Sequence, residues 1–188
     1  MFVFVGDESN VRQSREARFF IYGCIIIAAD KILDICKEIS CIRDKHRFTS
    51  DAEFKFDSRS RPAHLSYQEF TLAKNRVLEI CQDLEVRFMA YAVHHEIARN
   101  RERDLYLWAL NTLLLQFDFF LQRETSNGIC LVDRFKNDLN VLKKIHQQGV
   151  DPEVTDGSRL PRRLKNILCY STISIGTTHL ATVVDVVL

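Results

Sequence analysis

The first thirty residues contain two apolar segments joined by a polar stretch that has no helical face. Residues 2–5 form a short apolar run broken by Gly6 and the polar residues after it, a pattern typical of a buried strand that ends in a turn. Residues 19–29 are rich in aromatic and β-branched residues and predict a second strand. Residues 12–18 are charged and lack apolar periodicity, which indicates a loop or the tip of a hairpin. The sequence therefore predicts an antiparallel pair of strands.

After this pair, helical and strand patterns alternate along the chain. Apolar residues at helical spacing predict a helix capped by Asp30 and four more helices, over 66–84, 104–122, 137–148 and 177–188. Ser66 and Glu69 have the spacing of a capping box at the start of the helix over 66–84. Shorter apolar runs predict strands over 85–93, 128–132 and 167–175, with a brief edge strand over 54–56.

This order of elements predicts the fold class. A hairpin followed by alternating helices and strands indicates an α/β fold whose mixed sheet has an antiparallel N-terminal hairpin, later parallel strands, and helices on both faces. The 188 residues contain no internal repeat, linker or low-complexity tract, so we expect a single domain over 1–188. The sequence stops at Leu188 inside an apolar stretch without a capping residue. Either the natural chain continues past this residue or the last helix ends abruptly; we expect the former.

Composition and charge exclude several classes of protein. With 26 basic and 25 acidic side chains the net charge is +1, which argues against an unselective polycation but is compatible with a local basic patch. No apolar run approaches the roughly 20 residues of a membrane span, and the N-terminus lacks the basic region of a signal peptide. The six cysteines form no Cys-x-x-Cys pair, so neither a zinc ribbon nor a redox motif is indicated. We expect a cytoplasmic protein with reduced thiols.

Four acidic residues stand where an α/β protein places its functional groups. Asp7 and Asp133 each follow a predicted strand, and ligand sites of open sheets gather outside strand ends. Glu53 lies on the short strand or turn around residues 51–57. Asp185 is embedded in the most apolar segment of the chain, where an unpaired carboxylate is expensive unless a metal or another cation lies beside it.

Carboxylates that meet at one point repel each other unless a cation lies between them. Mg²⁺ and Mn²⁺ prefer oxygen ligands, and two such ions stabilise the attacking and leaving oxygens of phosphoryl transfer. We therefore predict that Asp7, Glu53, Asp133 and Asp185 are catalytic metal ligands and that Lys55 holds a phosphate or pairs with Glu53. Each acidic residue also has a plainer interpretation, as a turn former, a helix cap or a solvated charge.

Other residues are weaker candidates. We expect Glu8 and Ser9 to surround the ligands rather than to bind metal, and the adjacent His94 and His95 to be surface residues. Aromatic residues at helical spacing are expected to be core and not a base-stacking platform; they are Trp108, Phe117, Phe119 and Phe120. Basic residues cluster in loops or at helix ends, where they meet phosphate or are simply solvated; the clusters are Arg59/Arg61, Arg99/Arg101/Arg103 and Arg162/Arg163/Lys165.

Four of these segments resemble one protein family. Residues 4–9 are similar to the Asp-Glu-Ser-Gly opening of a large prokaryotic family, domain of unknown function 3800, with Asn10 in place of the glycine. Residues 53–55 resemble its Glu-x-Lys element, residues 131–133 its mid-chain strand ending in aspartate, and residues 184–187 its C-terminal Ala-Asp helix. The resemblance implies a ribonuclease H-like fold, acid-bound metal and cleavage of nucleic acid.

The sequence leaves two classes of function open. The first is a metal-dependent nuclease or related phosphodiesterase that uses Mg²⁺ or Mn²⁺. The alternative is a non-catalytic module on the same fold that binds nucleic acid or a partner protein, for example in a defence or mobile-element system. A haloacid-dehalogenase-like phosphatase ranks last, because Ser9 stands where that fold requires a second aspartate. We expect nucleic acid as the partner, and a homodimer is compatible with the sequence.

Overall fold

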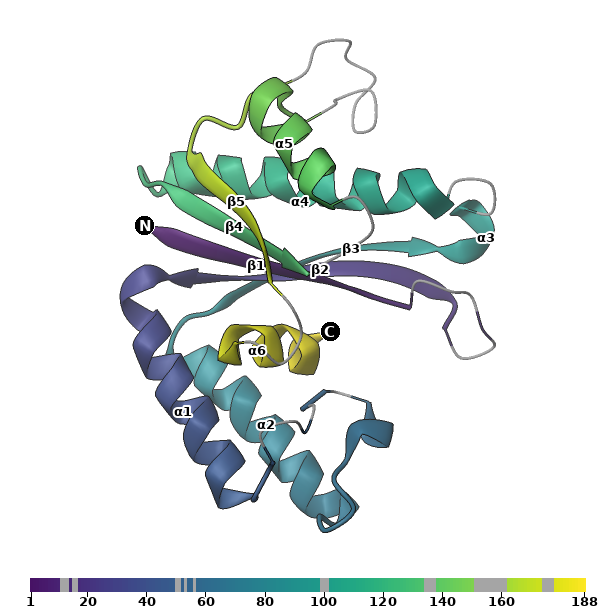
Figure 1. The fold of residues 1–188 in the computed structure, drawn as a ribbon, viewed down its shortest axis with the longest axis vertical. Helices are drawn as coiled ribbons and strands as arrows, with labels where there is room; N and C mark the ends of the chain where they lie inside the picture. Colours follow the sequence, from purple (N-terminus) through teal and green to yellow (C-terminus); the bar gives the residue numbers. More distant parts are fainter. Residues whose placement is uncertain are drawn as a thin grey trace.

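A five-stranded sheet lies at the centre of the structure, a computed structural model (Figure 1). The structure describes residues 1–10, 14, 17–49, 52, 54–55, 57–98, 102–133, 138–150, 162–173 and 178–188. The strands are β1 (Phe2–Ser9), β2 (Phe19–Ala28), β3 (Arg87–His94), β4 (Gly128–Asp133) and β5 (Ile167–Ile173). Their order across the sheet is β3-β2-β1-β4-β5.

The strand directions confirm the predicted mixed sheet. β2 is antiparallel to both β1 and β3, whereas β4 is parallel to both β1 and β5. β1 is longer than its apolar run predicts, because the polar residues after Gly6 stay paired with β2 as far as Ser9 and Ile21. Asp7 therefore lies within the strand, opposite Gly23, and not in a turn beyond it.

The residue that follows β1, Asn10, has a backbone conformation that suits asparagine. Asn10 has φ 58°, in the left-handed region that asparagine tolerates better than most residues. Its carbonyl oxygen lies 2.9 Å from Nε2 of His95 and accepts a hydrogen bond from it. This contact accounts for the burial of His95, which is 5% exposed, so the prediction of a surface histidine is wrong there.

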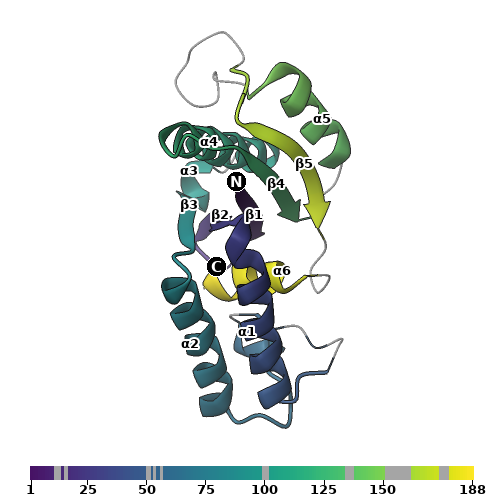
Figure 2. The ribbon, with the colours of Figure 1, turned by 90° about the vertical axis from the view of Figure 1, so that its left-hand side faces the viewer.

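Helices cover both faces of the sheet (Figures 1 and 2). α4 (Glu102–Arg123) and α5 (Asp138–Gln148) lie on one face, and α1 (Ile32–Lys45), α2 (Tyr67–Asp83) and α6 (His179–Val187) lie on the other. The short elements are η1 (Ala29–Lys31), η2 (Ser58–Ser60) and α3 (His95–Ala98). This architecture confirms the expected α/β fold with a mixed sheet and helices on both faces. Among the helices that are described, none combines the length and apolarity of a membrane span.

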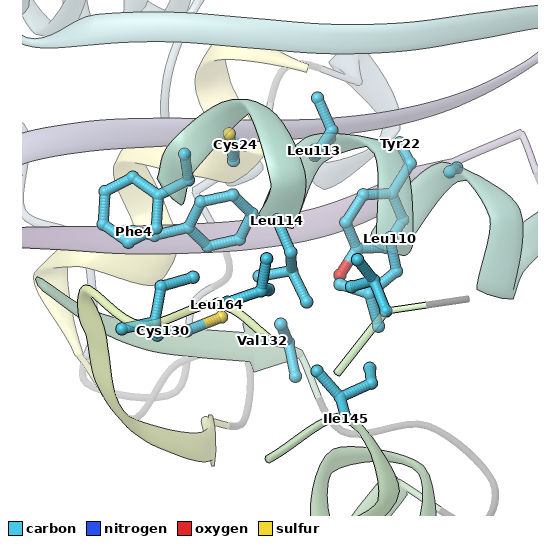
Figure 3. Packing of buried hydrophobic residues seen from close by; sticks show 14 of the residues in the cluster. Phe4, Tyr22, Cys24, Leu110, Leu113, Leu114, Cys130, Val132, Ile145 and Leu164 are labelled. Carbon is cyan, nitrogen blue, oxygen red and sulfur yellow. The ribbon is translucent and has the colours of Figure 1, made fainter. Parts of the chain in front are cut away.

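The core on the α4 face is built from alternate residues of the central strands. Figure 3 shows Leu110 and Leu114 of α4 packed with Phe4 and Tyr22 of the sheet. Phe117 and Phe120 are buried as predicted, but Phe119 is 39% exposed, so its assignment to the core is wrong. A helix that lies on one side of a sheet leaves part of its surface to solvent, whatever the side chains there.

The core on the opposite face contains α6. Val3 and Val5 of β1 point to this side, where Val183 and Val184 of α6 are at most 1% exposed. Because side chains of a strand alternate between its faces, Asp7 lies on the same side as Val5. The sheet and α6 thus bring an aspartate of the first strand toward the last helix.

α1 does not begin as the sequence indicated. Asp30 lies in η1, and the residue that caps α1 is Lys31, with no side-chain hydrogen bond to the helix end. The chain turns directly from β2 into η1, held by a backbone hydrogen bond from Ala29 to Met1 at 2.9 Å. This tight connection replaces the predicted aspartate cap.

Ser66 caps α2 as predicted, and removal of its hydroxyl group should lower the stability of the protein by a measurable amount. Its Oγ accepts a hydrogen bond from the Glu69 amide at 3.2 Å, and the Glu69 carboxylate accepts one from the Ser66 amide at 2.8 Å. Ser66→Ala is expected to lower the free energy of unfolding by about 1 kcal/mol in urea denaturation. Ser40→Ala, inside α1, is the control and should cost nothing, since alanine is the better helix former. An equal loss in both variants would contradict the capping role.

Candidate functional site

Two of the predicted site residues lie at the same end of neighbouring parallel strands. Gly6 of β1 pairs with Val132 of β4, so the next residues, Asp7 and Asp133, are neighbours. Leu131 packs into the core on the α6 face, and Asp133, two residues later, shares that side with Asp7. The strand register therefore places both aspartates on the α6 side of the sheet.

The third aspartate comes from α6. Thr178 caps this helix by accepting a hydrogen bond from the Ala181 amide at 3.1 Å, which sets where the helix starts. Asp185 follows the buried Val184 and faces the sheet at the same pocket as Asp7 and Asp133. The pocket is small: its volume is about 10 Å³, the room that one water molecule or one small ion needs. Three predicted site residues that are far apart in sequence thus line one pocket.

Asp7 and Asp185 interact directly. Their carboxyl groups are close enough for a hydrogen bond between them. Burial, the charge of Asp7 and this hydrogen bond raise the pKa of Asp185 to about 7. Burial also raises the pKa of Asp7, as does the charge of Asp133, against the hydrogen bond from the Glu8 amide at 2.7 Å. The pocket therefore resists complete ionisation at neutral pH.

Glu8 follows Asp7 in β1, but it is not one of the residues that line the pocket. Burial, followed by the charges of Asp7 and Asp133, raises the pKa of Glu8 to about 7. Its Oε2 is buried without a hydrogen-bond partner among the residues that the structure describes. It lies opposite Tyr22 in the sheet, on the α4 side of β1. The consecutive Asp7-Glu8 pair was visible in the sequence, but its burial depends on β1 extending past Gly6.

Lys55 supplies positive charge to this site. Its ammonium group lowers the pKa of both Asp7 and Asp185. The preceding residue, Phe54, is buried and stacks on Phe48 with the ring centroids 4.6 Å apart. This anchor holds the loop that carries Lys55 against the α6 side of the molecule. The fourth predicted ligand, Glu53, lies outside the described residues.

The donors at the site suit a hard cation, although no ligand sphere is formed. Among the residues that the structure describes, no group of three His, Cys, Asp or Glu side chains has the geometry of a metal site. The polar side chains that line the pocket are all carboxylates. Such a set fits Mg²⁺ or Mn²⁺ better than zinc.

The predicted basic clusters differ in their surroundings. Arg59 forms an ion pair with Asp57 at 2.5 Å, and Arg61 donates to the Leu65 carbonyl, so both serve the local structure of η2. The cluster at 99–103 has no described side chains. Arg162 stacks on Phe119, at the far end of α4 from residue 102.

Among known proteins, the chain is similar only in structure, to solved structures of low sequence identity. No family model and no curated protein matches the chain. The ribonuclease HII of Archaeoglobus fulgidus, solved in its complex with PCNA, aligns at 12% identity and TM-score 0.43, over 98% of this chain and 68% of that one. Bst-RNase HIII, solved with Mn²⁺, aligns at 9% identity and TM-score 0.47, over 98% and 50% of the two chains. Aquifex aeolicus RNase H3 aligns at 12% identity and TM-score 0.34, over 98% and 54%.

The chain spans about half the length of the last two proteins. These identities and TM-scores carry no residue role over to this chain.

Proposed function

We propose that the chain is a metal-dependent nuclease or related phosphodiesterase that acts on nucleic acid. The observation that carries this proposal is the shared pocket of Asp7, Asp133 and Asp185, which come from β1, β4 and α6. Partly buried carboxylates at close range cost free energy, as the raised pKa values of Asp7 and Asp185 indicate. A site that retains this arrangement is well explained by a divalent cation that offsets the repulsion.

The ligands of the proposed site are Asp7, Asp133 and Asp185, with Glu53 as a fourth. Bound Mg²⁺ or Mn²⁺ would activate water and neutralise the charge that develops on the phosphate.

Lys55 has a separate role in the proposal. Its ammonium group lies near Asp7 and Asp185 and would contact a phosphate oxygen of the substrate backbone. This contact orients the phosphate toward the carboxylate pocket.

The proposed substrate class follows from the sequence. The resemblance of residues 4–9 to domain of unknown function 3800 stays a prediction, and it agrees with a phosphodiester substrate. The choice of Mg²⁺ or Mn²⁺ rests on the oxygen donors of the pocket, and cytoplasmic location stays a prediction as well.

Titration with Mn²⁺ tests the metal and the reaction together. The melting temperature is measured first in excess EDTA and then in about 1–5 mM Mn²⁺, a concentration chosen to exceed a weak dissociation constant. It should be several degrees higher in Mn²⁺ than in EDTA. Labelled single-stranded RNA, single-stranded DNA and an RNA–DNA hybrid should be incubated in parallel. Cleavage of at least one of them, dependent on the cation, is the expected result.

The other outcomes separate the two classes of function. A rise in melting temperature without cleavage of any substrate would support the binding module on the same fold. No response of the melting temperature to Mn²⁺ or Mg²⁺ would contradict the metal site itself. Asp44→Asn, at an exposed position of α1, is the control and should respond to Mn²⁺ as the unmodified chain does.

A further inference from the structure

α4 and α6 cover opposite faces of the sheet (Figure 1). A basic and aromatic surface lies on the α4 side. We name it the arginine surface; it consists of Arg87 of β3, Gln116, Phe119, Phe120 and Arg123 of α4, and Arg162 before β5. All of these except Arg162 line a groove of about 240 Å³ between α4 and β3. The surface shares no residue with the acidic pocket.

The three guanidinium groups are held in place by aromatic rings. Those of Arg87 and Arg123 lie 4.8 and 5.8 Å from the ring centroid of Phe120. That of Arg162 lies 4.2 Å from the centroid of Phe119. A guanidinium stacked on a ring is fixed in orientation, and its N–H groups stay available along the edge for an acceptor such as phosphate.

The positive charge of this surface is only partly neutralised. Arg87 pairs with Glu124 at 3.5 Å, and in the part of the chain that the structure describes this is the one ion pair made by the three arginines. Two guanidinium groups over the same ring repel each other, so an anion bound between them would lower the electrostatic energy. The surface is therefore complementary to a negatively charged ligand.

The exposed ring of Phe119 indicates which class of negatively charged ligand fits the arginine surface. Phe119 is 39% exposed although its neighbour Phe120 is buried. It lies against Arg162 and lines the same groove as Arg87 and Arg123. A positively charged groove with an exposed aromatic ring is typical of surfaces that bind single-stranded nucleic acid, because phosphates meet the cations and an unpaired base stacks on the ring. An acidic peptide would pair with the arginines, but its carboxylates would not stack on the exposed ring of Phe119.

We propose that the arginine surface binds single-stranded nucleic acid, with phosphates on Arg123 and Arg162 and a base against Phe119. This binding site is independent of the proposed nuclease site, because the two lie on opposite faces of the sheet. It is therefore expected to persist when the acidic pocket is inactivated.

The proposal is tested by fluorescence anisotropy in a buffer that contains EDTA. The probe is a labelled 15-nucleotide oligo(dT), whose length is about that of one single-strand binding site. The Asp7→Asn protein is used, so cleavage cannot deplete the probe. We expect a dissociation constant of about 10⁻⁵ M at low salt that rises steeply with salt. Arg123→Gln/Arg162→Gln should weaken binding at least about tenfold and lower the salt slope by about 1.4. Phe119→Leu should weaken binding about tenfold and leave the salt slope unchanged.

Lys37→Gln/Lys45→Gln is the matched control, since it removes the same number of charges from α1 on the other face of the sheet. It should leave binding within about twofold of the starting protein, because charges beyond a Debye length are largely screened. An equal loss in both double variants would overturn the proposal, as would the absence of binding at low salt. A polyglutamate peptide that binds as tightly as the oligonucleotide would assign the surface to an acidic protein partner instead, and duplex DNA that binds equally well would exclude base stacking on Phe119.

Discussion

Asp7→Asn is expected to lower the rate of cation-dependent cleavage by at least about 100-fold while it raises the melting temperature of the metal-free protein. The first effect follows from the loss of a charged ligand, because metal-ion catalysis contributes several kcal/mol and each 1.36 kcal/mol changes the rate about tenfold. The second follows from the loss of a charge that raises the pKa of both Asp185 and Glu8. One substitution should thus impair the reaction and stabilise the fold.

The substitution preserves the local structure. The amide oxygen of asparagine can still accept the hydrogen bond that the Glu8 amide donates to Asp7 at 2.7 Å. The asparagine side chain has nearly the shape of the aspartate, so its packing against the neighbouring residues is retained. If the relief of repulsion is worth about 1 kcal/mol, the melting temperature at pH 8 should rise by about 2–4 °C.

Thermal melting in EDTA and a cleavage assay in Mn²⁺ measure the two effects separately. Asp34→Asn removes the same charge from the exposed face of α1 and should leave both unchanged within error, since its ion pair with Lys37 is a surface pair at 3.8 Å. Cleavage that survives in Asp7→Asn would exclude Asp7 as a ligand. A fall in the melting temperature would indicate that the carboxylate stabilises the metal-free fold, contrary to the repulsion argued here.

The fold was predictable because its main determinants are local. The hairpin followed from two apolar segments without a helix between them, and its partner strands followed from runs such as residues 128–132. The errors have physical causes as well. Residues 7–9 are polar, so they ended the predicted strand, whereas their backbone groups continue the ladder with β2 whatever their side chains are. How far a strand extends is decided by hydrogen bonds to its partner strand. The local sequence pattern does not show where that partner lies.

The site was predictable in part for a similar reason. Parallel strands end at the same edge of a sheet, which placed Asp7 beside Asp133, and the cost of burying Asp185 among valines indicated a shared environment. The burial of Glu8 depends on its place opposite Tyr22 in the paired strand β2, on the side of the sheet that α4 covers. The exposure of Phe119 depends on which side of α4 meets the sheet. Both are properties of packing and not of spacing in the sequence.

The metal-free protein is expected to be more stable at pH 5 than at pH 8. Asp185 and Glu8 have a pKa of about 7 in the folded state, chiefly because of burial, and ordinary values near 4 when unfolded. Between these values the folded chain binds more protons than the unfolded chain, so the free energy of unfolding falls as the pH rises from about 4 to 7 and is level above that. Because both side chains are partly exposed to water, which screens their interactions, we expect a loss of about 1–2 kcal/mol for each.

Saturating Mn²⁺ should reverse this dependence, because a cation between the carboxylates favours their ionised forms and competes with protons for them. Urea denaturation from pH 5 to pH 8, in EDTA and in Mn²⁺, measures both slopes. Histidines also titrate in this range, so the informative quantity is the difference between the unmodified chain and Asp185→Asn at each pH. That difference should favour the variant increasingly toward pH 8 in EDTA and favour the unmodified chain in Mn²⁺. The same sign in both buffers would mean that the acidic pocket does not discriminate between a proton and a metal ion, and the metal site would have to be abandoned.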